Sequence, residues 1–86
     1  MARRLYIGNL SFKVAEPELE RMFSELELPL ASVQVMREPA SGKSRGFAFA
    51  ELEHPAELAH AIEILNGKVL DGRALAVAEA RPERRR

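Results

Sequence analysis

Residues 45–52, RGFAFAEL, constrain the fold more than any other part of the sequence. Side chains of a β-strand alternate between two faces. In this segment Phe47 and Phe49 share a face with Arg45 and Glu51, whereas only alanine and leucine occupy the opposite face. If the segment is a strand, its largest apolar side chains therefore lie beside its charges, on the side that normally meets water.

Three further segments alternate with period two, as half-buried strands do. The dipeptide Asp71-Gly72 precedes the last of them and is typical of a tight hairpin turn. The predicted strands are residues 4–10, 32–38, 45–52 and 74–80.

Two segments, residues 15–28 and 54–67, carry apolar residues at helical spacing. Pro29 is expected to end the first helix, and Asn66-Gly67 is a typical C-cap for the second. The residues predicted to face the core are Leu19, Met22, Phe23 and Leu26 in the first helix, and Leu58, Ala59, Ile62 and Leu65 in the second.

The resulting order, β-α-β-β-α-β, predicts an α+β, ferredoxin-like sandwich with one four-stranded antiparallel sheet. Each helix follows a strand, so both can pack on the same face of the sheet, and the other face stays open. The covered face is predicted to hold Leu5, Ile7, Val33, Val35, Ala48, Ala50, Leu52, Leu75 and Val77. The open face is predicted to hold Tyr6, Gln34, Met36, Phe47, Phe49, Ala76 and Ala78.

The bulk composition fits one small domain, since the chain has 86 residues of which 47% are hydrophobic. The absence of cysteine excludes disulfides and thiolate zinc sites, and it suits a reducing cytosol. No apolar run reaches the roughly 20 residues that span a bilayer, and the N-terminal segment has no secretory apolar stretch. We expect a cytoplasmic monomer with no membrane segment.

The net charge of zero conceals a segregation of charge along the chain. Residues 15–30 hold five glutamates and one arginine, and residues 53–65 hold three glutamates and no lysine or arginine. The rest of the chain holds twelve Lys and Arg against five Asp and Glu. If both acidic segments are helices on one side of the sheet, the molecule is polarised. Acidic residues also favour helix starts and solvated helix faces, and both interpretations can hold.

Three stretches carry a resemblance to a known family. LYIGNL (5–10) and RGFAFAEL (45–52) resemble the short and long ribonucleoprotein signatures of the RNA recognition motif, and residues 65–80 resemble its closing segment. The resemblance covers nearly the whole chain and implies an RNA recognition motif domain over residues 1–81, followed by a basic tail, residues 82–86. The short chain, which begins with methionine, also resembles the small single-domain RNA-binding proteins of bacteria.

The resemblance implies roles for particular residues. Tyr6, Phe47 and Phe49 lie where the family places the aromatics that stack on bases, and Arg45 lies at the basic position that meets a phosphate. Ala50 and Leu52 depart from the pattern, with Ala50 where a larger aliphatic residue is usual and Leu52 where an aromatic is usual. The segment LELPL likewise replaces the usual aromatic-glycine ending after the first helix, which leaves the shape of that loop open.

The physical chemistry of the open face predicts the same use. Flat rings stack on the π-faces of unpaired bases, so the expected partner is single-stranded RNA, with single-stranded DNA as an open alternative. Further cations in loops and in the tail can neutralise phosphates: Lys13, Arg37, Lys43 and Arg81. The sheet residues Gln34, Met36 and Ala78 are candidates for contacts that select the sequence, although Met36 is equally a flexible filler.

Other interpretations of the same residues stay open. Phe47 and Phe49 can be core residues beneath a partner or a second copy, and Arg45 can pair with Glu51 or another carboxylate. The rival function is a protein-interaction adaptor of the same fold that holds a peptide on its helical face or on a modified sheet.

The sequence gives little support for a catalytic site or a metal site. GKS at residues 42–44 lacks the leading glycine of a phosphate-binding loop, because Arg37 stands there, and a strand follows instead of a helix. His54 and His60 are six residues apart and have no further ligand cluster beside them. We therefore predict a domain without catalytic residues, metal or cofactor.

Overall fold

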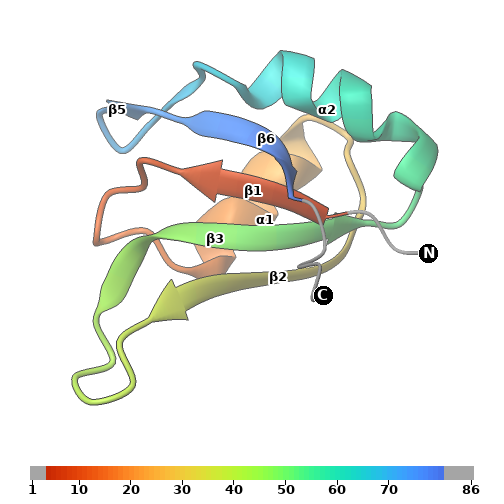
Figure 1. Cartoon of the computed structure of the whole chain (residues 1–86). Coiled ribbons are helices and arrows are strands. Elements are labelled where there is room, and N and C mark those ends of the chain that lie inside the picture. The colour runs from red at the N-terminus through yellow and green to blue at the C-terminus, as the bar shows by residue number, and fades with distance from the viewer. Residues whose placement is uncertain (1–3, 81–86) are drawn as a thin grey trace, which may run out of the picture.

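A computed structural model describes residues 4–80. Two α-helices and a four-stranded sheet make up most of it, with a short hairpin beside them (Figure 1). The predicted phosphate contact Arg81 and the basic tail, residues 82–86, lie outside the described residues. The elements are β1 (Arg4–Gly8), α1 (Glu16–Glu25), β2 (Leu30–Arg37), β3 (Ser44–Leu52), a 3₁₀ turn η1 (Pro55–Glu57), α2 (Leu58–Leu65), β4 (Val69–Leu70), β5 (Arg73–Ala74) and β6 (Ala76–Ala80).

The sheet has the strand order β2-β3-β1-β6, and every neighbouring pair is antiparallel. The predicted ferredoxin-like architecture is thereby confirmed. Figure 1 views the sheet from its open face, with α1 crossing behind it. Because β1 and β3 are the two central strands, the predicted aromatic residues lie in the middle of the sheet.

The core lies between the sheet and the helices. Every residue predicted for the covered face is buried except Val33, which is half-buried against the core. Leu5 and Ile7 of β1 are fully buried, and burial of a side chain of this size contributes about 1.5–3 kcal/mol. Ala50 and Leu52, the two departures from the family pattern, are 1% and 5% exposed and pack in this core.

The first helix ends earlier than predicted. It stops at Glu25, and the chain then reverses at Glu27, whose φ of 59° lies in the left-handed region. The N–H of Leu28 donates to the carbonyl of Phe23 at 2.9 Å, which is the closing bond of a Schellman turn. Leu28 is thus turned into the core, at 2% exposure, before Pro29 is reached.

The second helical segment is also shorter than predicted. A 3₁₀ turn, Pro55–Glu57, leads into α2, which ends at Leu65 with Asn66 as its C-cap. The prediction that Ala59 faces the core is wrong: Ala59 is exposed, and Ala61 is fully buried in its place. The buried stripe follows steps of three and four from Leu58 through Ala61 to Leu65.

The hairpin predicted at Asp71-Gly72 is confirmed. Both residues have positive φ, 52° and 80°, as a two-residue turn of the I′ type requires, and they join β4 to β5. Ala74, which was expected in the last strand, pairs with Val69 in this hairpin instead. The fourth strand of the main sheet accordingly begins at Ala76.

Candidate nucleic-acid interface

Three aromatic rings meet on the open face of the sheet. Tyr6 on β1 and Phe49 on β3 are register partners, and Phe47 lies two residues before Phe49. The ring centroids are 5.7 Å apart for Tyr6 and Phe47, 6.0 Å for Tyr6 and Phe49, and 5.8 Å for Phe47 and Phe49. All three are partly exposed. We call these three residues the ring cluster. Their position confirms the prediction that the aromatics lie on the sheet face opposite the helices.

Gly8 determines how Tyr6 lies on the sheet. A Cβ atom built on Gly8 would lie 2.8 Å from both Cε2 and Cζ of the Tyr6 ring. Real Cβ atoms essentially never approach other atoms so closely, so the ring occupies space that only glycine leaves free. Tyr6 therefore lies along its own strand rather than standing up from it.

Two arginines lie against the ring cluster. The guanidinium carbon of Arg45 is 5.6 Å from the centroid of Phe47, and that of Arg4 is 5.0 Å from the centroid of Phe49. Arg45 pairs weakly with Glu38, at 4.0 Å, and Glu51 pairs instead with Arg4, at 3.9 Å. Sequence reasoning missed Arg4, although it lies two residues before Tyr6 and so shares its face.

The three tentative sheet contacts share the face of the ring cluster. Gln34 is exposed and opposite Phe49 in register, and Ala78 is exposed and opposite Tyr6. Met36 is half-buried and lies where the pairing of β2 with β3 shifts register, between Val35 and Arg37. Their roles toward a ligand stay predictions.

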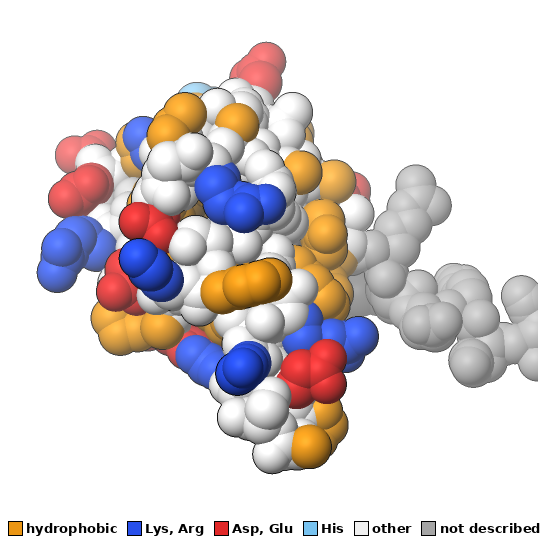
Figure 2. Space-filling model, turned by 90° about the vertical axis from the view of Figure 1, so that its left-hand side faces the viewer, with side chains coloured by type: hydrophobic (Ala, Val, Ile, Leu, Met, Phe, Trp, Pro, Cys, Tyr) orange, Lys and Arg blue, Asp and Glu red, His pale blue; other side chains and the backbone are white. Residues whose placement is uncertain are grey.

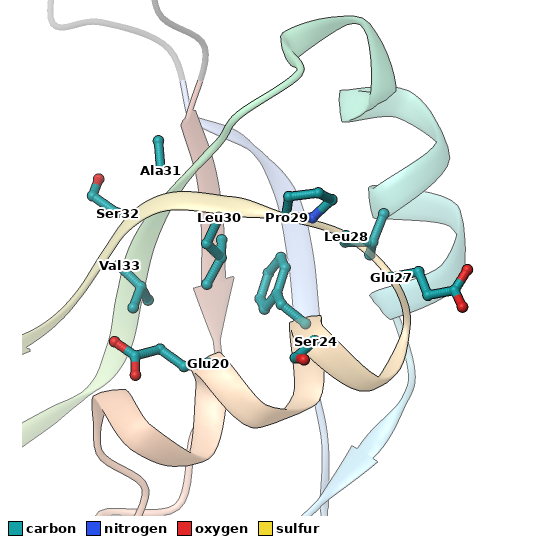
Figure 3. A pocket seen from close by; sticks show the side chains of 10 residues that line it. Glu20, Ser24, Glu27, Leu28, Pro29, Leu30, Ala31, Ser32 and Val33 are labelled. Carbon is teal, nitrogen blue, oxygen red and sulfur yellow. The ribbon is translucent and has the colours of Figure 1, made fainter.

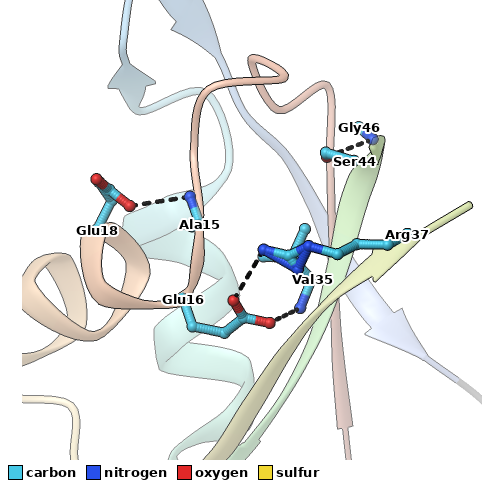
Figure 4. Close-up of polar contacts among 7 residues, drawn as sticks. All are labelled: Ala15, Glu16, Glu18, Val35, Arg37, Ser44 and Gly46. Atoms are coloured by element: carbon cyan, nitrogen blue, oxygen red, sulfur yellow. Dashed lines mark hydrogen bonds and ion pairs between the residues drawn. The ribbon is translucent and has the colours of Figure 1, made fainter. Parts of the chain in front are cut away.

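Arg37 lies apart from the ring cluster and contacts α1 (Figure 4). Its Nη2 atom donates to Oε1 of Glu16 at 3.1 Å, and the N–H of Val35 donates to Oε2 of the same carboxylate at 2.8 Å. Partial burial acts to raise the pKa of Glu16, but the N–H groups of Val35 and Glu16 and the charge of Arg37 together hold that pKa below its usual value of 4.5. A phosphate contact by Arg37 stays a prediction, because it has to compete with Glu16.

The loops at one end of the sheet hold the other two predicted cations. Lys13 follows β1, Lys43 precedes β3, and both line a depression of about 300 Å³ together with Phe12. Figure 2 views this end of the molecule and shows Lys and Arg side chains distributed among exposed hydrophobic ones. Sequence reasoning missed Phe12, which is 76% exposed, since a single aromatic in a turn has no periodicity to mark it.

A second hollow, a groove of about 490 Å³, lies between α1 and β2 (Figure 3). Apolar side chains such as Phe23, Leu28 and Leu30 line it together with the carboxylates of Glu20 and Glu27. The acidic groups disfavour a phosphate backbone here. The groove is therefore a poorer nucleic-acid site than the face with the rings and arginines.

The remaining predicted features concern metals and membranes. Across residues 4–80 no three His, Cys, Asp or Glu side chains gather in a way that can hold a metal ion. Within the same residues, neither helix has the length and apolar character to cross a bilayer.

The fold and the ring cluster together define a class of protein: small α+β domains whose open sheet face presents aromatic side chains suited to unpaired bases. Comparison with known sequences gives the family. The profile of the RNA recognition motif matches residues 5–76, and this chain belongs to that family, as its signatures predicted.

Relatives and solved structures agree with this assignment. A 29 kDa chloroplast ribonucleoprotein of Arabidopsis thaliana is 45% identical over 83 residues, 94% of this chain but only 24% of the relative. The putative RNA-binding protein RbpA of a Synechocystis species is 42% identical over 82 residues, 95% of this chain and 80% of that protein. The Sxl-lethal protein, solved in complex with RNA, superposes with a TM-score of 0.86 at 28% identity, covering 96% of this chain and 49% of that one.

Proposed function

We propose that this domain binds single-stranded RNA by stacking bases on Tyr6, Phe47 and Phe49. The ring cluster carries the proposal, because its three partly exposed rings lie within 6.0 Å of one another on the two central strands. Stacking on an aromatic ring contributes about 1–3 kcal/mol per base. A similar domain was solved with RNA, and a 45% identical relative is a ribonucleoprotein, which supports RNA as the partner.

The same geometry favours a short, unpaired segment. Bases in a duplex are already stacked on their neighbours and cannot lie on a protein ring. A cluster of three rings matches a footprint of about two or three bases. A footprint of this length predicts weak binding with relaxed sequence preference, tuned at the margins by Gln34, Met36 and Ala78.

A bound base displaces the arginine that lies against the same ring. A guanidinium over an exposed ring contributes about 0.5–1 kcal/mol, less than a stacked base. Bases therefore displace Arg4 and Arg45 from Phe49 and Phe47, and the freed guanidinium groups turn to the phosphates of the same strand. Lys13 and Lys43 in the adjoining loops, with Arg37 and Arg81, complete the proposed set of phosphate contacts.

Removal of two rings tests the proposal. The wild type and a Phe47→Ala/Phe49→Ala variant are titrated with an unstructured RNA pool at two salt concentrations, and Val69→Ala serves as a control for loss of an exposed apolar side chain from β4. We expect the double variant to lose about 1–3 kcal/mol of binding free energy per ring, and Val69→Ala to bind as the wild type does. Wild-type affinity should fall as salt rises, since phosphate contacts release counterions.

Equal and salt-insensitive binding by all three proteins would contradict stacking on this face. The rival function, a protein-interaction adaptor, would then rest on the groove between α1 and β2. A matched single-stranded DNA competitor decides between the two nucleic acids, because only RNA offers a 2′-hydroxyl.

The remaining features of the proposal concern the module as a whole. We propose that residues 1–81 form the module, that residues 82–86 add positive charge, and that the protein is a cytoplasmic monomer that binds RNA without catalysing a reaction. The 42% identity to the putative RNA-binding protein RbpA of a Synechocystis species, over 80% of that protein's length, supports a module of this size. Light scattering of the full chain tests the monomer, and imaging of the tagged chain in its source cell tests the location.

A further inference from the structure

The loop between β1 and α1 holds an aromatic side chain that the ring cluster does not include. Phe12 is 76% exposed, whereas Leu10 and Val14 on either side of it are 2% and 3% exposed. These two buried residues anchor the loop in the core at both ends. The exposure of Phe12 therefore follows from a backbone that is fixed in place.

The same loop is fixed against the start of β3. The N–H of Leu10 donates to the carbonyl of Gly46 at 2.9 Å. A Cβ atom built on Gly46 would lie 3.3 Å from Cε1 of Phe12, so an edge of this ring lies in the space that glycine leaves free. Gly46 directly precedes Phe47 in β3, so Phe12 packs one residue along the strand from the ring cluster, on the side to which a Cβ of Gly46 would point.

Three cationic side chains share a depression with Phe12. Phe12 lines the depression of about 300 Å³ together with Lys13, Arg37 and Lys43. The volume of this depression is at the lower end of the range typical of ligand sites. Within residues 4–80, neither Lys13 nor Lys43 forms an ion pair, whereas Arg37 contacts Glu16. A flat apolar ring next to two unpaired ammonium groups matches the two parts of a nucleotide, a base and a phosphate.

We propose that Phe12 is a fourth stacking position, which takes one further nucleotide of the bound strand beyond those on the ring cluster. The base lies on the free side of the Phe12 ring, and Lys13 and Lys43 contact the adjoining phosphate in the depression. This inference rests on the proposed RNA binding by the ring cluster. It extends the footprint around the end of the sheet onto the loop.

A length series of oligonucleotides separates the two sites. The full chain is titrated at low salt with unstructured tri- and pentanucleotide RNA pools, as wild type, Phe12→Ala, Phe47→Ala/Phe49→Ala and the Val69→Ala control. We expect Phe12→Ala to weaken pentanucleotide binding by roughly 5-fold or more and to leave trinucleotide binding unchanged. Val69→Ala, which truncates a side chain of similar exposure (65%), should bind both RNAs as the wild type does.

A tryptophan at position 12 gives a direct readout. The chain contains no tryptophan, so Phe12→Trp introduces a single fluorophore. We expect pentanucleotide binding to quench its emission, trinucleotide binding to leave it nearly unchanged, and the pentanucleotide affinity of this variant to equal that of the wild type.

Three outcomes would overturn the inference. Wild-type affinity of Phe12→Ala for both lengths would leave Phe12 without a role, while a loss in Phe47→Ala/Phe49→Ala would still support the ring cluster. Equal loss for both lengths would mean that Phe12 only supports the sheet site through Gly46. Unchanged binding by Phe47→Ala/Phe49→Ala would end the proposed function itself, and the fourth position with it.

Discussion

At the scale of single residues, Gly8 provides the space in which the ring of Tyr6 lies. Its φ is not in the left-handed region, so alanine is sterically acceptable to the backbone there. A methyl group would nevertheless collide with the ring of Tyr6. We expect Gly8→Ala to tilt Tyr6 out of place and to weaken RNA binding by about 1 kcal/mol, the lower end of one stacking contact.

A double-mutant cycle isolates this effect, with RNA affinity measured for Gly8→Ala, Tyr6→Ala and the combined variant. If Gly8 acts through Tyr6, Gly8→Ala will have no further effect once Tyr6 is absent. Additive losses would show instead that Gly8 contributes through the backbone of β1.

Position in a strand decides which residues of the site could be predicted from the sequence. Phe47, Phe49 and Tyr6 were predictable because alternation along a strand assigns every side chain to a face. Arg4 obeys the same alternation and was overlooked. Phe12 was not predictable in this way, because its exposure depends on Leu10 and Val14 being drawn into a core that only the folded chain defines.

At the scale of elements, Glu16 joins α1 to the edge strand β2. Its carboxylate accepts hydrogen bonds from Val35 and Arg37, and its pKa is lowered in the folded protein. A carboxyl group with a lowered pKa stabilises the fold above its unfolded pKa, and this stability is lost as the pH falls through the folded pKa. The contribution is therefore complete at neutral pH and lost only in acid, below about pH 4.5.

We expect Glu16→Gln to lower the free energy of unfolding by about 1 kcal/mol at pH 7, since one charged acceptor near the surface is lost. Urea unfolding at pH 7 and at pH 3 measures the difference from wild type, which should shrink in acid. Glu20→Gln, on the same helix and without these bonds, is the matched control. A difference as large at pH 3 as at pH 7 would contradict the role of the charge.

The turn after α1 holds a residue in an unfavourable conformation. Glu27 has a φ of 59°, where glycine is normally found at a helix C-terminus, and its negative charge opposes the helix dipole. We expect Glu27→Gly to raise the free energy of unfolding by about 0.5–1 kcal/mol. Chemical denaturation measures it, with Glu20→Gly inside the helix as a control that should destabilise by a similar amount.

The helices also mark where prediction from sequence was weakest. Their existence, order and core faces were predictable from apolar spacing, but the early end of α1 depends on the Glu27 turn, which has no glycine to signal it. Ala59 and Ala61 are chemically identical, so composition does not distinguish them, but Ala61 lies three residues after Leu58 and four before Leu65 and is the one that is buried.

At the scale of the whole molecule, the positive and negative charges sum to zero but are unevenly distributed. Glutamates gather on α1 and beside the groove, whereas Lys13 and Lys43 lie in the loops at one end of the sheet. Arg4 and Arg45 lie on the ring cluster, where each pairs with a glutamate. An approaching polyanion is repelled from the acidic face of α1 and attracted to the loops that hold the lysines. The polarity that the sequence suggested thus coincides with the arrangement of the layers.

Ultraviolet crosslinking of the full chain to an unstructured RNA pool, followed by mass spectrometry of the attached peptides, tests most directly that the open sheet face is the binding surface. We predict crosslinks within residues 4–8 and 44–52, the strands of the ring cluster. Crosslinks confined to residues 20–33, which line the acidic groove, would contradict the account.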